Sequence, residues 1–227
     1  MEARDINYKS KKNIMKIGII GSGQIGGNLG KYWAKAGHEV LFSSRHPNQL
    51  ASLARDAGNN AKAVSVAEAF EANADAYLLA TPFEAIDNIS ELYAGEYGNK
   101  IIIDATNPYP ERDGKMAQEV RDANYNASEY TAMKFNTAKT IKAFNTIKAE
   151  DLRDRAFRSQ DKLSIPYAAQ DEESKTIGRQ LIEDIGFDAL YVGDLSASNI
   201  MDPDKAIYGK SLELIKLKDL VNASKEY

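Results

Sequence analysis

Short apolar runs alternate with amphipathic stretches along most of the chain. The runs are brief and rich in Ile, Val, Leu and Ala, which is typical of buried strands. They predict strands at residues 17–20, 38–43, 62–64, 76–80, 100–104, 140–145, 163–169 and 188–192. Between them, helical spacing and start or stop residues predict helices at residues 24–36, 47–57, 65–72, 82–93, 128–135 and 171–185, and a terminal helix from about residue 203.

Two predicted helices carry capping-box signals at their start. Ser65 is followed by Glu68, and Thr81 is followed by Glu84. In such a box each side chain accepts a hydrogen bond from a free backbone N–H of the first turn. Pro82 would occupy the first helical position of the second of these helices.

Three other segments depart from the strand–helix pattern. Pro166 favours a position at the sheet edge for its strand, because proline cannot donate to a ladder. Residues 105–115 contain two prolines and a glycine and predict an irregular loop. Residues 148–162 are dense in charge and predict a solvated helix or connector.

The first strand ends in a glycine turn, within the stretch KIGIIGSGQIGGNLG. Gly21, Gly23 and Gly26 have G-x-G-x-x-G spacing between a strand and a helix, the context of a dinucleotide-binding motif. Gly21 permits the turn, Gly23 lets the backbone approach a pyrophosphate, and Gly26 lets helix and strand pack closely. The unpaired N–H groups at the helix start attract phosphate. Trp33 belongs to the buried stripe of this helix.

Alternating strands and helices predict an α/β fold, a Rossmann-type doubly wound and mostly parallel sheet of about eight strands. Six strands that end near Asn145 complete the nucleotide-binding domain. We expect a flexible arm at residues 1–14, the Rossmann domain at 15–147, and a small C-terminal α/β extension at 148–227.

Composition narrows the function classes. The 227 residues are 43% hydrophobic and 27% charged, as in a soluble globular protein, and the net charge of −4 argues against a general nucleic-acid binder. There is no cysteine, which excludes disulfides and thiol catalysis and fits a cytoplasmic location. No run reaches transmembrane length.

The end of the second predicted strand indicates which dinucleotide binds. An NAD enzyme usually has a carboxylate there, whereas this chain reads Ser43, Ser44, Arg45, His46. Arg and Ser suit a 2′-phosphate, because a guanidinium neutralises its charge and a hydroxyl adds a donor. We therefore predict NADP as the cofactor. His46 is a third phosphate ligand or simply exposed.

Further polar residues follow later strands at the same edge. Thr81 and Pro82 are predicted near the nicotinamide, although the cap role alone would account for the threonine. The segment DATNP, residues 104–108, and Asn145 are candidate contacts or ordinary turn residues. Strand alternation puts Lys142 and Phe144 on one face and Asn145 on the other.

No residue set predicts acid–base, nucleophilic or metal chemistry. His38 is expected at the surface, and two histidines without cysteine offer no persuasive metal site. We therefore expect no catalytic side chain. Hydride transfer between two redox cofactors needs none, because the protein binds and orients them.

The chain resembles the NADPH-dependent oxidoreductases of the deazaflavin coenzyme F-420, whose relatives include the cytoplasmic domains of membrane ferric reductases. The matching pieces run from Lys16 to about Ser196 and include GHEVLFSSR, DATNP, TIKAFNTI and IGFDALYVGDLS. The resemblance implies a homodimer. It also implies that the pyrophosphate contacts Ser22, Gly23, Gln24 and Ile25. The 2′-phosphate would contact Ser44 and Arg45, with Gln49 nearby. The nicotinamide would contact Ala143, Phe144 and Asn145.

Two segments differ from the enzymes that use F-420: the loop after Asn107 and the tail after Ser196. The sequence therefore predicts hydride transfer between NADPH and a flavin-like or deazaflavin acceptor, without naming the acceptor. A 3-hydroxyacid or imine reductase is disfavoured, because the residues after Asn145 still alternate strand and helix. An NADP-sensing or electron-transfer module that acts through a protein partner is the alternative. We expect no membrane or nucleic-acid partner.

Overall fold

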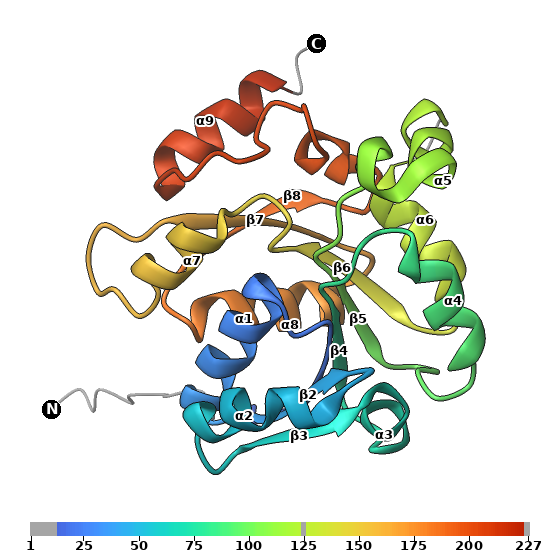
Figure 1. Ribbon diagram of the computed structural model, residues 1–227. Coiled ribbons are helices and arrows are strands. Elements are labelled where there is room, and N and C mark those ends of the chain that lie inside the picture. The colour runs from blue at the N-terminus through green and yellow to red at the C-terminus, as the bar shows by residue number, and fades with distance from the viewer. Residues whose placement is uncertain (1–12, 124–125, 225–227) are drawn as a thin grey trace, which may run out of the picture.

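The computed structural model describes residues 13–123 and 126–224, and it contains one eight-stranded sheet (Figure 1). The strand order is β3-β2-β1-β4-β5-β6-β7-β8, and every neighbouring pair is parallel except the antiparallel pair β6–β7. The predicted α/β fold is therefore confirmed. The strands are β1 (Lys16–Ile20), β2 (Glu39–Ser44), β3 (Ala61–Ser65), β4 (Ala76–Leu79), β5 (Ile101–Asp104), β6 (Lys139–Ala143), β7 (Ser164–Ala169) and β8 (Asp188–Gly193).

Helices cover both faces of the sheet and the outside of its last strands (Figure 1). One apolar core packs α1, α2, α7 and α8 on one face, and a second packs α3, α4, α5 and α6 on the other. A third, smaller core joins β7 and β8 to α9. The helices are α1 (Gln24–Lys35), α2 (Ala51–Ala57), α3 (Val66–Glu71), α4 (Ala85–Leu92), α5 (Pro110–Asp122), α6 (Ala127–Lys134), α7 (Ala149–Arg155), α8 (Glu172–Glu183) and α9 (Leu214–Ser224), with 3-10 turns η1 (Pro47–Leu50) and η2 (Ser196–Met201).

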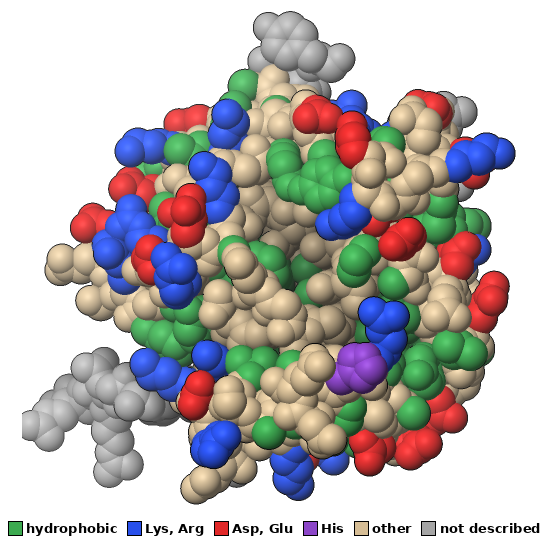
Figure 2. Space-filling view, in the orientation of Figure 1, with side chains coloured by type: hydrophobic (Ala, Val, Ile, Leu, Met, Phe, Trp, Pro, Cys, Tyr) green, Lys and Arg blue, Asp and Glu red, His purple; other side chains and the backbone are tan. Residues whose placement is uncertain are grey.

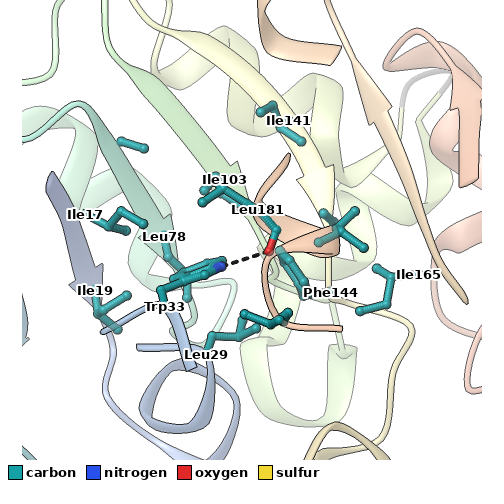
Figure 3. Close-up of a cluster of buried hydrophobic side chains, with 14 of the residues drawn as sticks. Ile17, Ile19, Leu29, Trp33, Leu78, Ile103, Ile141, Phe144, Ile165 and Leu181 are labelled. Carbon is teal, nitrogen blue, oxygen red and sulfur yellow. Dashed lines mark hydrogen bonds between the residues drawn. The ribbon is translucent and has the colours of Figure 1, made fainter. Parts of the chain in front are cut away.

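Trp33 of α1 lies at the centre of the first core (Figure 3). It is fully buried, and its indole N–H donates to the Leu181 carbonyl of α8 at 2.9 Å. Its ring meets the edge of Phe144 at a centroid distance of 5.7 Å. The buried stripe predicted for this helix is therefore correct, and it connects α1 to the loop that follows β6.

The predicted sheet-edge position of Pro166 is wrong, because β7 lies between β6 and β8. The ladder with β6 covers only Tyr167, Ala168 and Ala169. Pro166 pairs with Leu190 of β8 and lies beyond the end of the β6 ladder. A strand inside the sheet can therefore contain proline here, because no β6 residue pairs with Pro166 and no ladder hydrogen bond to β6 is lost.

The second predicted capping box is also wrong, whereas the Ser65 box forms as predicted. The helix begins at Ala85, three residues after Pro82, and its N-cap Glu84 makes no side-chain cap. Phe83 is fully buried in the second core. Burial of this ring fixes the preceding turn, and Thr81 is left outside the helix.

Two further predictions need correction, the irregular loop at residues 105–115 and the start of the terminal helix. Residues 110–122 form α5 rather than continuing the irregular loop, with Pro110 at its start and a break at Gly114, whose φ is +67°. The terminal helix begins at Leu214, not near residue 203. Gly209, also at positive φ, donates its N–H to the Thr146 carbonyl at 3.0 Å, so tertiary hydrogen bonds replace helical ones there.

His38 is fully buried rather than at the surface. Its Nδ1 accepts from the Met15 backbone N–H at 3.1 Å, and its Nε2 lies 2.8 Å from the carboxylate of Asp184, the residue directly after α8. It therefore joins the first strand to α8. The arm predicted at residues 1–14 lies outside the described residues as far as residue 12. Among the described helices, none combines the length and apolar character needed to cross a membrane.

Candidate nucleotide-binding site

The three glycines of the motif occupy different environments. A Cβ on Gly21, whose φ is +98°, would lie 2.6 Å from the Ala80 carbonyl oxygen, and one on Gly26 would lie 2.0 Å from the Gly21 carbonyl oxygen. A Cβ on Gly23 would meet no protein atom within 4 Å. Gly21 and Gly26 are therefore needed for packing, and Gly23 faces open space at the start of α1. This helix start has no side-chain cap and no acidic residue in its first turn, which leaves its N–H groups available to an anion.

A cavity of about 390 Å³ opens next to Gly23. It lies at the carboxyl ends of β1, β4, β5 and β6, where the strand order reverses and such sheets bind ligands. Figure 2 shows this face of the molecule hollowed near its centre, with hydrophobic side chains along the upper rim of the hollow. The cavity is lined by Gly23, Gln24, Ile25, Ala80, Thr81, Pro82, Ala105, Thr106, Asn107, Tyr109, Arg112, Phe144, Asn145, Ile147, Ala149 and Tyr208.

Two side-chain oxygens that line this cavity are buried without a hydrogen-bond partner, Thr81 Oγ1 and Asn145 Oδ1. A buried polar atom without a partner costs roughly 1–3 kcal/mol. Most buried polar groups are paired, so two orphaned oxygens in one cavity indicate that a polar ligand completes them. The loss of the predicted cap therefore leaves Thr81 available to a ligand.

Asn107 and Asn145 join the loops after β5 and β6. Asn145 Nδ2 donates to Asn107 Oδ1 at 3.0 Å, and Asn107 Nδ2 donates to the Asn145 carbonyl at 3.0 Å. Asn145 Nδ2 also donates to the Met201 carbonyl at 2.8 Å. These bonds fix the direction of the Asn145 amide and leave its Oδ1 as the free acceptor.

Phe144 adopts a left-handed backbone conformation, with φ of +65°. For a bulky residue such a conformation is strained, and strain of this kind clusters at functional sites. It turns the Phe144 ring into the first core beside Trp33, whereas Lys142 lies on the opposite face, paired with Asp104. The predicted shared face of Lys142 and Phe144 is therefore wrong, because strand alternation stops at Ala143.

Beneath the cavity, the Lys142 ammonium donates to Asp104 Oδ2 at 3.1 Å and to the Thr106 carbonyl at 2.6 Å. Asp104 Oδ1 accepts from the Thr106 N–H and hydroxyl, and Oδ2 accepts from the Thr131 hydroxyl. Burial raises the pKa of nearby Asp202, an effect that Lys142 opposes. This network holds the Thr106 backbone, which forms part of the cavity wall.

The loop after β2 lies outside the lining of the cavity. The Ser43 hydroxyl is fully buried and donates to the Ile19 carbonyl at 2.8 Å, so it points into the sheet. The Ser44 hydroxyl accepts from the His46 N–H at 3.0 Å and remains half-buried. Arg45 and His46 are exposed. Because both basic side chains are exposed, they can approach a phosphate.

The remaining candidates occupy three places. Gln49 is exposed in η1, close in sequence to Arg45. The Ser22 hydroxyl donates to the Ser43 carbonyl at 3.2 Å and so joins the glycine turn to the end of β2. Ala143 is buried in the first core and does not line the cavity.

Sequence reasoning missed three residues that line the cavity, Tyr109, Arg112 and Tyr208. The Tyr109 and Tyr208 hydroxyls are hydrogen bonded to each other although they are 99 residues apart. Arg112 lies over the Tyr109 ring, with Cζ 4.9 Å from its centroid. Tyr109 follows Asn107 and Tyr208 follows Ser196, and no local signal in either segment indicates that the two tyrosines meet.

Part of the chain matches a known protein family. Residues 16–108 match the family model described as NADP oxidoreductase coenzyme F420-dependent. The metalloreductase STEAP3 of Rattus norvegicus is 26% identical over 187 residues, 82% of this chain but 36% of its own, so this chain spans about a third of that relative. The range that matches the family model, residues 16–108, includes the glycine turn and the loop after β2.

Solved structures share the fold. The hypothetical protein SMa0349 from Sinorhizobium meliloti has a TM-score of 0.75 at 24% identity, with 88% of this chain and 96% of that chain covered. A structure from Arthrobacter sp. FB24, described as an F420-dependent NADP reductase, has a TM-score of 0.69 at 23% identity and covers 82% and 87%. The resemblance found in the sequence is thus confirmed, since residues 16–108 match the model of the coenzyme F420-dependent NADP oxidoreductases.

Proposed function

We propose that this protein transfers a hydride between NADPH and a flavin-like or deazaflavin acceptor, coenzyme F-420 among them. The observation that carries the proposal is the pair of unpartnered oxygens, Thr81 Oγ1 and Asn145 Oδ1, in the cavity that begins at Gly23. A nicotinamide carboxamide offers both a donor and an acceptor for such atoms. Gly23 and the uncapped start of α1 would hold the pyrophosphate.

The choice of NADP over NAD is supported by the loop after β2. It carries no carboxylate at residues 43–46, and Ser44 and Arg45 offer a hydroxyl and an exposed guanidinium. Ser22 and Gln49 flank these residues. When bound, NADPH supplies the hydride, and the residues of this chain bind the cofactor, orient it and exclude water.

The wider proposal is a cytoplasmic homodimer that acts on a small redox acceptor, without a membrane or nucleic-acid partner. The net charge of −4 supports the exclusion of nucleic acid. One observation favours the alternative of a module that acts through a protein partner. The matched part of the rat metalloreductase is only 36% of that protein, so this fold also occurs as one portion of a larger chain.

Thr81→Val tests the nucleotide site, because it removes only the unpartnered hydroxyl. We expect the Kd for NADP⁺ to rise by a few-fold to about ten-fold, the effect of one lost hydrogen bond, while Tm stays unchanged or rises. Trp33 fluorescence can report binding, since its ring contacts Phe144 at the cavity wall. The matched control is Thr140→Val, which removes another buried, unpartnered hydroxyl that does not line the cavity.

Steady-state oxidation of NADPH and NADH, with FMN and with coenzyme F-420 as separate acceptors, tests the reaction. The proposal expects turnover with NADPH and at least one acceptor. Tight NADP⁺ binding without turnover by either acceptor would favour the partner-dependent alternative. Equal NADP⁺ affinity in Thr81→Val and wild type would contradict the proposed contact between the Thr81 hydroxyl and the nucleotide.

A further inference from the structure

Tyr109, Arg112 and Tyr208 form one part of the cavity lining. The two tyrosine hydroxyls are hydrogen bonded to each other. Arg112 Nη2 donates to the Asn107 carbonyl at 2.9 Å and so ties this group to the Asn107–Asn145 pair. All three side chains lie after residue 108, beyond the range that matches the family model. The family match therefore assigns them no role.

Charge in this part of the cavity is nearly balanced. Arg112 Nε and Nη2 donate to the two carboxylate oxygens of Asp113 at 2.9 and 2.8 Å. Asp113 Oδ2 also accepts from the Tyr109 N–H at 2.9 Å. Burial alone would raise the pKa of Asp113, but the bonds from Arg112 and the Tyr109 N–H lower it overall, so the carboxylate is charged and neutralises the guanidinium.

A neutralised guanidinium beside two phenols suits an uncharged polar ring better than a phosphate. Flavins and deazaflavins share such a chemistry: a flat conjugated ring with carbonyl oxygens and a ring nitrogen along one edge. Phenol hydroxyls can donate to these acceptors, and an aromatic face can stack on the ring. A phosphate is better suited to Arg45 in the loop after β2, because Arg45 is exposed and has no neutralising carboxylate among the described residues.

We propose that the Tyr109–Tyr208 hydroxyl pair is the acceptor subsite and gives a proton to a heteroatom of the acceptor ring as the hydride arrives. This inference rests on the proposed function and adds a named proton donor to it. NADPH supplies two electrons and one proton as the hydride and is oxidised to NADP⁺, and the acceptor is reduced. The tyrosine pair supplies the second proton, breaks one O–H bond and recovers that proton from solvent, so the acceptor gains two hydrogens in all.

The geometry of the pair favours this role. When one phenol gives up its proton, the second can donate to the phenolate oxygen, and a hydrogen bond to a charged acceptor is stronger than one between neutral groups. The Arg112 guanidinium, which Asp113 neutralises, packs over the Tyr109 ring and holds that ring in place. Burial, and then the bond with Tyr109, raises the pKa of Tyr208, so the Tyr208 hydroxyl stays protonated and can donate to a Tyr109 phenolate.

The experiment compares Tyr109→Phe, Tyr208→Phe and a control, Tyr130→Phe. The Tyr130 hydroxyl also bonds to a side chain, Asp87 at 2.6 Å, but does not line the cavity. Protein saturated with NADP⁺ is titrated with FMN and, in a second arm, with coenzyme F-420. Protein loaded with NADPH is then mixed with each acceptor, and the rate of NADPH oxidation is followed from pH 6 to 10.

We expect both cavity variants to bind NADP⁺ within about two-fold of wild type and to lose roughly three- to ten-fold in affinity for the accepted ring. The oxidation rate should fall by about a hundred-fold across this pH range, the usual effect of losing a general acid. The arm that shows these losses identifies the ring.

Three results would overturn the inference. If both phenylalanine variants oxidise NADPH at the wild-type rate, the hydroxyl pair only joins two chain segments. The proposed function then stands. Loss of NADP⁺ affinity in the variants shows that the pair serves the nucleotide. Wild-type protein that binds neither FMN nor F-420 overturns the acceptor subsite, and absent turnover with both overturns the proposed hydride transfer as well.

Discussion

The ammonium of Lys142 lies 3.1 Å from the carboxylate of Asp104, and both side chains are fully shielded from solvent. The pair joins β6 to β5 where the two strands end. Burying two charges costs much of what their attraction returns, so the pair contributes little net stability. Its position beneath Thr106 indicates that it shapes the cavity wall instead.

Lys142→Met should be strongly destabilising, because it leaves the Asp104 charge buried and uncompensated. Breaking a buried pair typically costs about 3–5 kcal/mol of unfolding free energy. Urea denaturation gives this value directly. The control is Lys115→Met, which removes an exposed ion pair with Glu119 and should change stability by less than about 1 kcal/mol. Similar losses in the two variants would contradict the buried charge interaction.

Two glycine substitutions should separate binding from folding. Gly26→Ala places a methyl group 2.0 Å from the Gly21 carbonyl oxygen and should lower Tm substantially. Gly23→Ala meets no protein atom, so Tm should stay close to that of wild type while NADP⁺ affinity is lost, because the methyl group fills the space for the pyrophosphate. Calorimetry measures both effects. Undiminished affinity in a folded Gly23→Ala protein would show that the turn is only structural.

Cofactor preference should depend on Arg45. Arg45→Ala is expected to weaken NADPH binding by roughly ten-fold and to leave NADH nearly unchanged, because a hydrogen bond to a charged group is worth about 1.5–3 kcal/mol before solvent exposure reduces it. Ser44→Asp should reverse the preference, since a carboxylate repels a 2′-phosphate and accepts from a 2′-hydroxyl. Titrations at low salt measure both nucleotides. Equal losses for NADPH and NADH would mean that Arg45 only supports its loop.

Stability should also depend on the ionisation of Asp202. Burial raises the pKa of Asp202, and the nearby Asp104 raises it further. Lys142, Lys205 and the Ala127 N–H, which donates to Oδ2, lower this pKa but do not cancel the effect of burial. A raised folded-state pKa means that the folded protein holds this proton more tightly than the unfolded chain. The resulting stability is full below the ordinary value of 3.8 and is lost as pH rises through the folded-state pKa.

Asp202→Asn removes this dependence, because the amide stays neutral. Its Tm relative to wild type should therefore increase from pH 4 to pH 8, as scanning calorimetry would record. The exposed Asp56→Asn serves as the control and should show a constant difference. A gap for Asp202→Asn that shrinks as pH rises would show that Lys142 outweighs burial at this carboxyl.

The sequence predicted those parts of the fold that depend on local pattern. The eight strands and the glycine turn followed from apolar runs and from Gly21, Gly23 and Gly26. The false cap at Thr81 shows the limit of local signals, because burial of Phe83 determines where α4 begins. The helix after Pro110 had a recognisable signal, proline at a helix start, but the neighbouring glycine concealed it.

The candidate site was predictable only where it follows from strand ends. Thr81, Asn107 and Asn145 lie in the cavity because parallel strands end at one edge. The partners of the buried Lys142, and the contact of Tyr109 with Tyr208, depend on chain segments that meet only in three dimensions. The unpartnered oxygens of Thr81 and Asn145 likewise become visible only when every neighbouring donor has been placed.

The contact between Trp33 and Phe144 sets a distance across the binding site. Trp33 belongs to the helix whose start would meet the pyrophosphate, and Phe144 shapes the loop that would meet the nicotinamide. Both rings are locked in the core before any ligand arrives (Figure 3). The spacing between the two ends of the dinucleotide is thus built into the folded protein, and binding should cost little conformational entropy and leave the backbone almost unmoved.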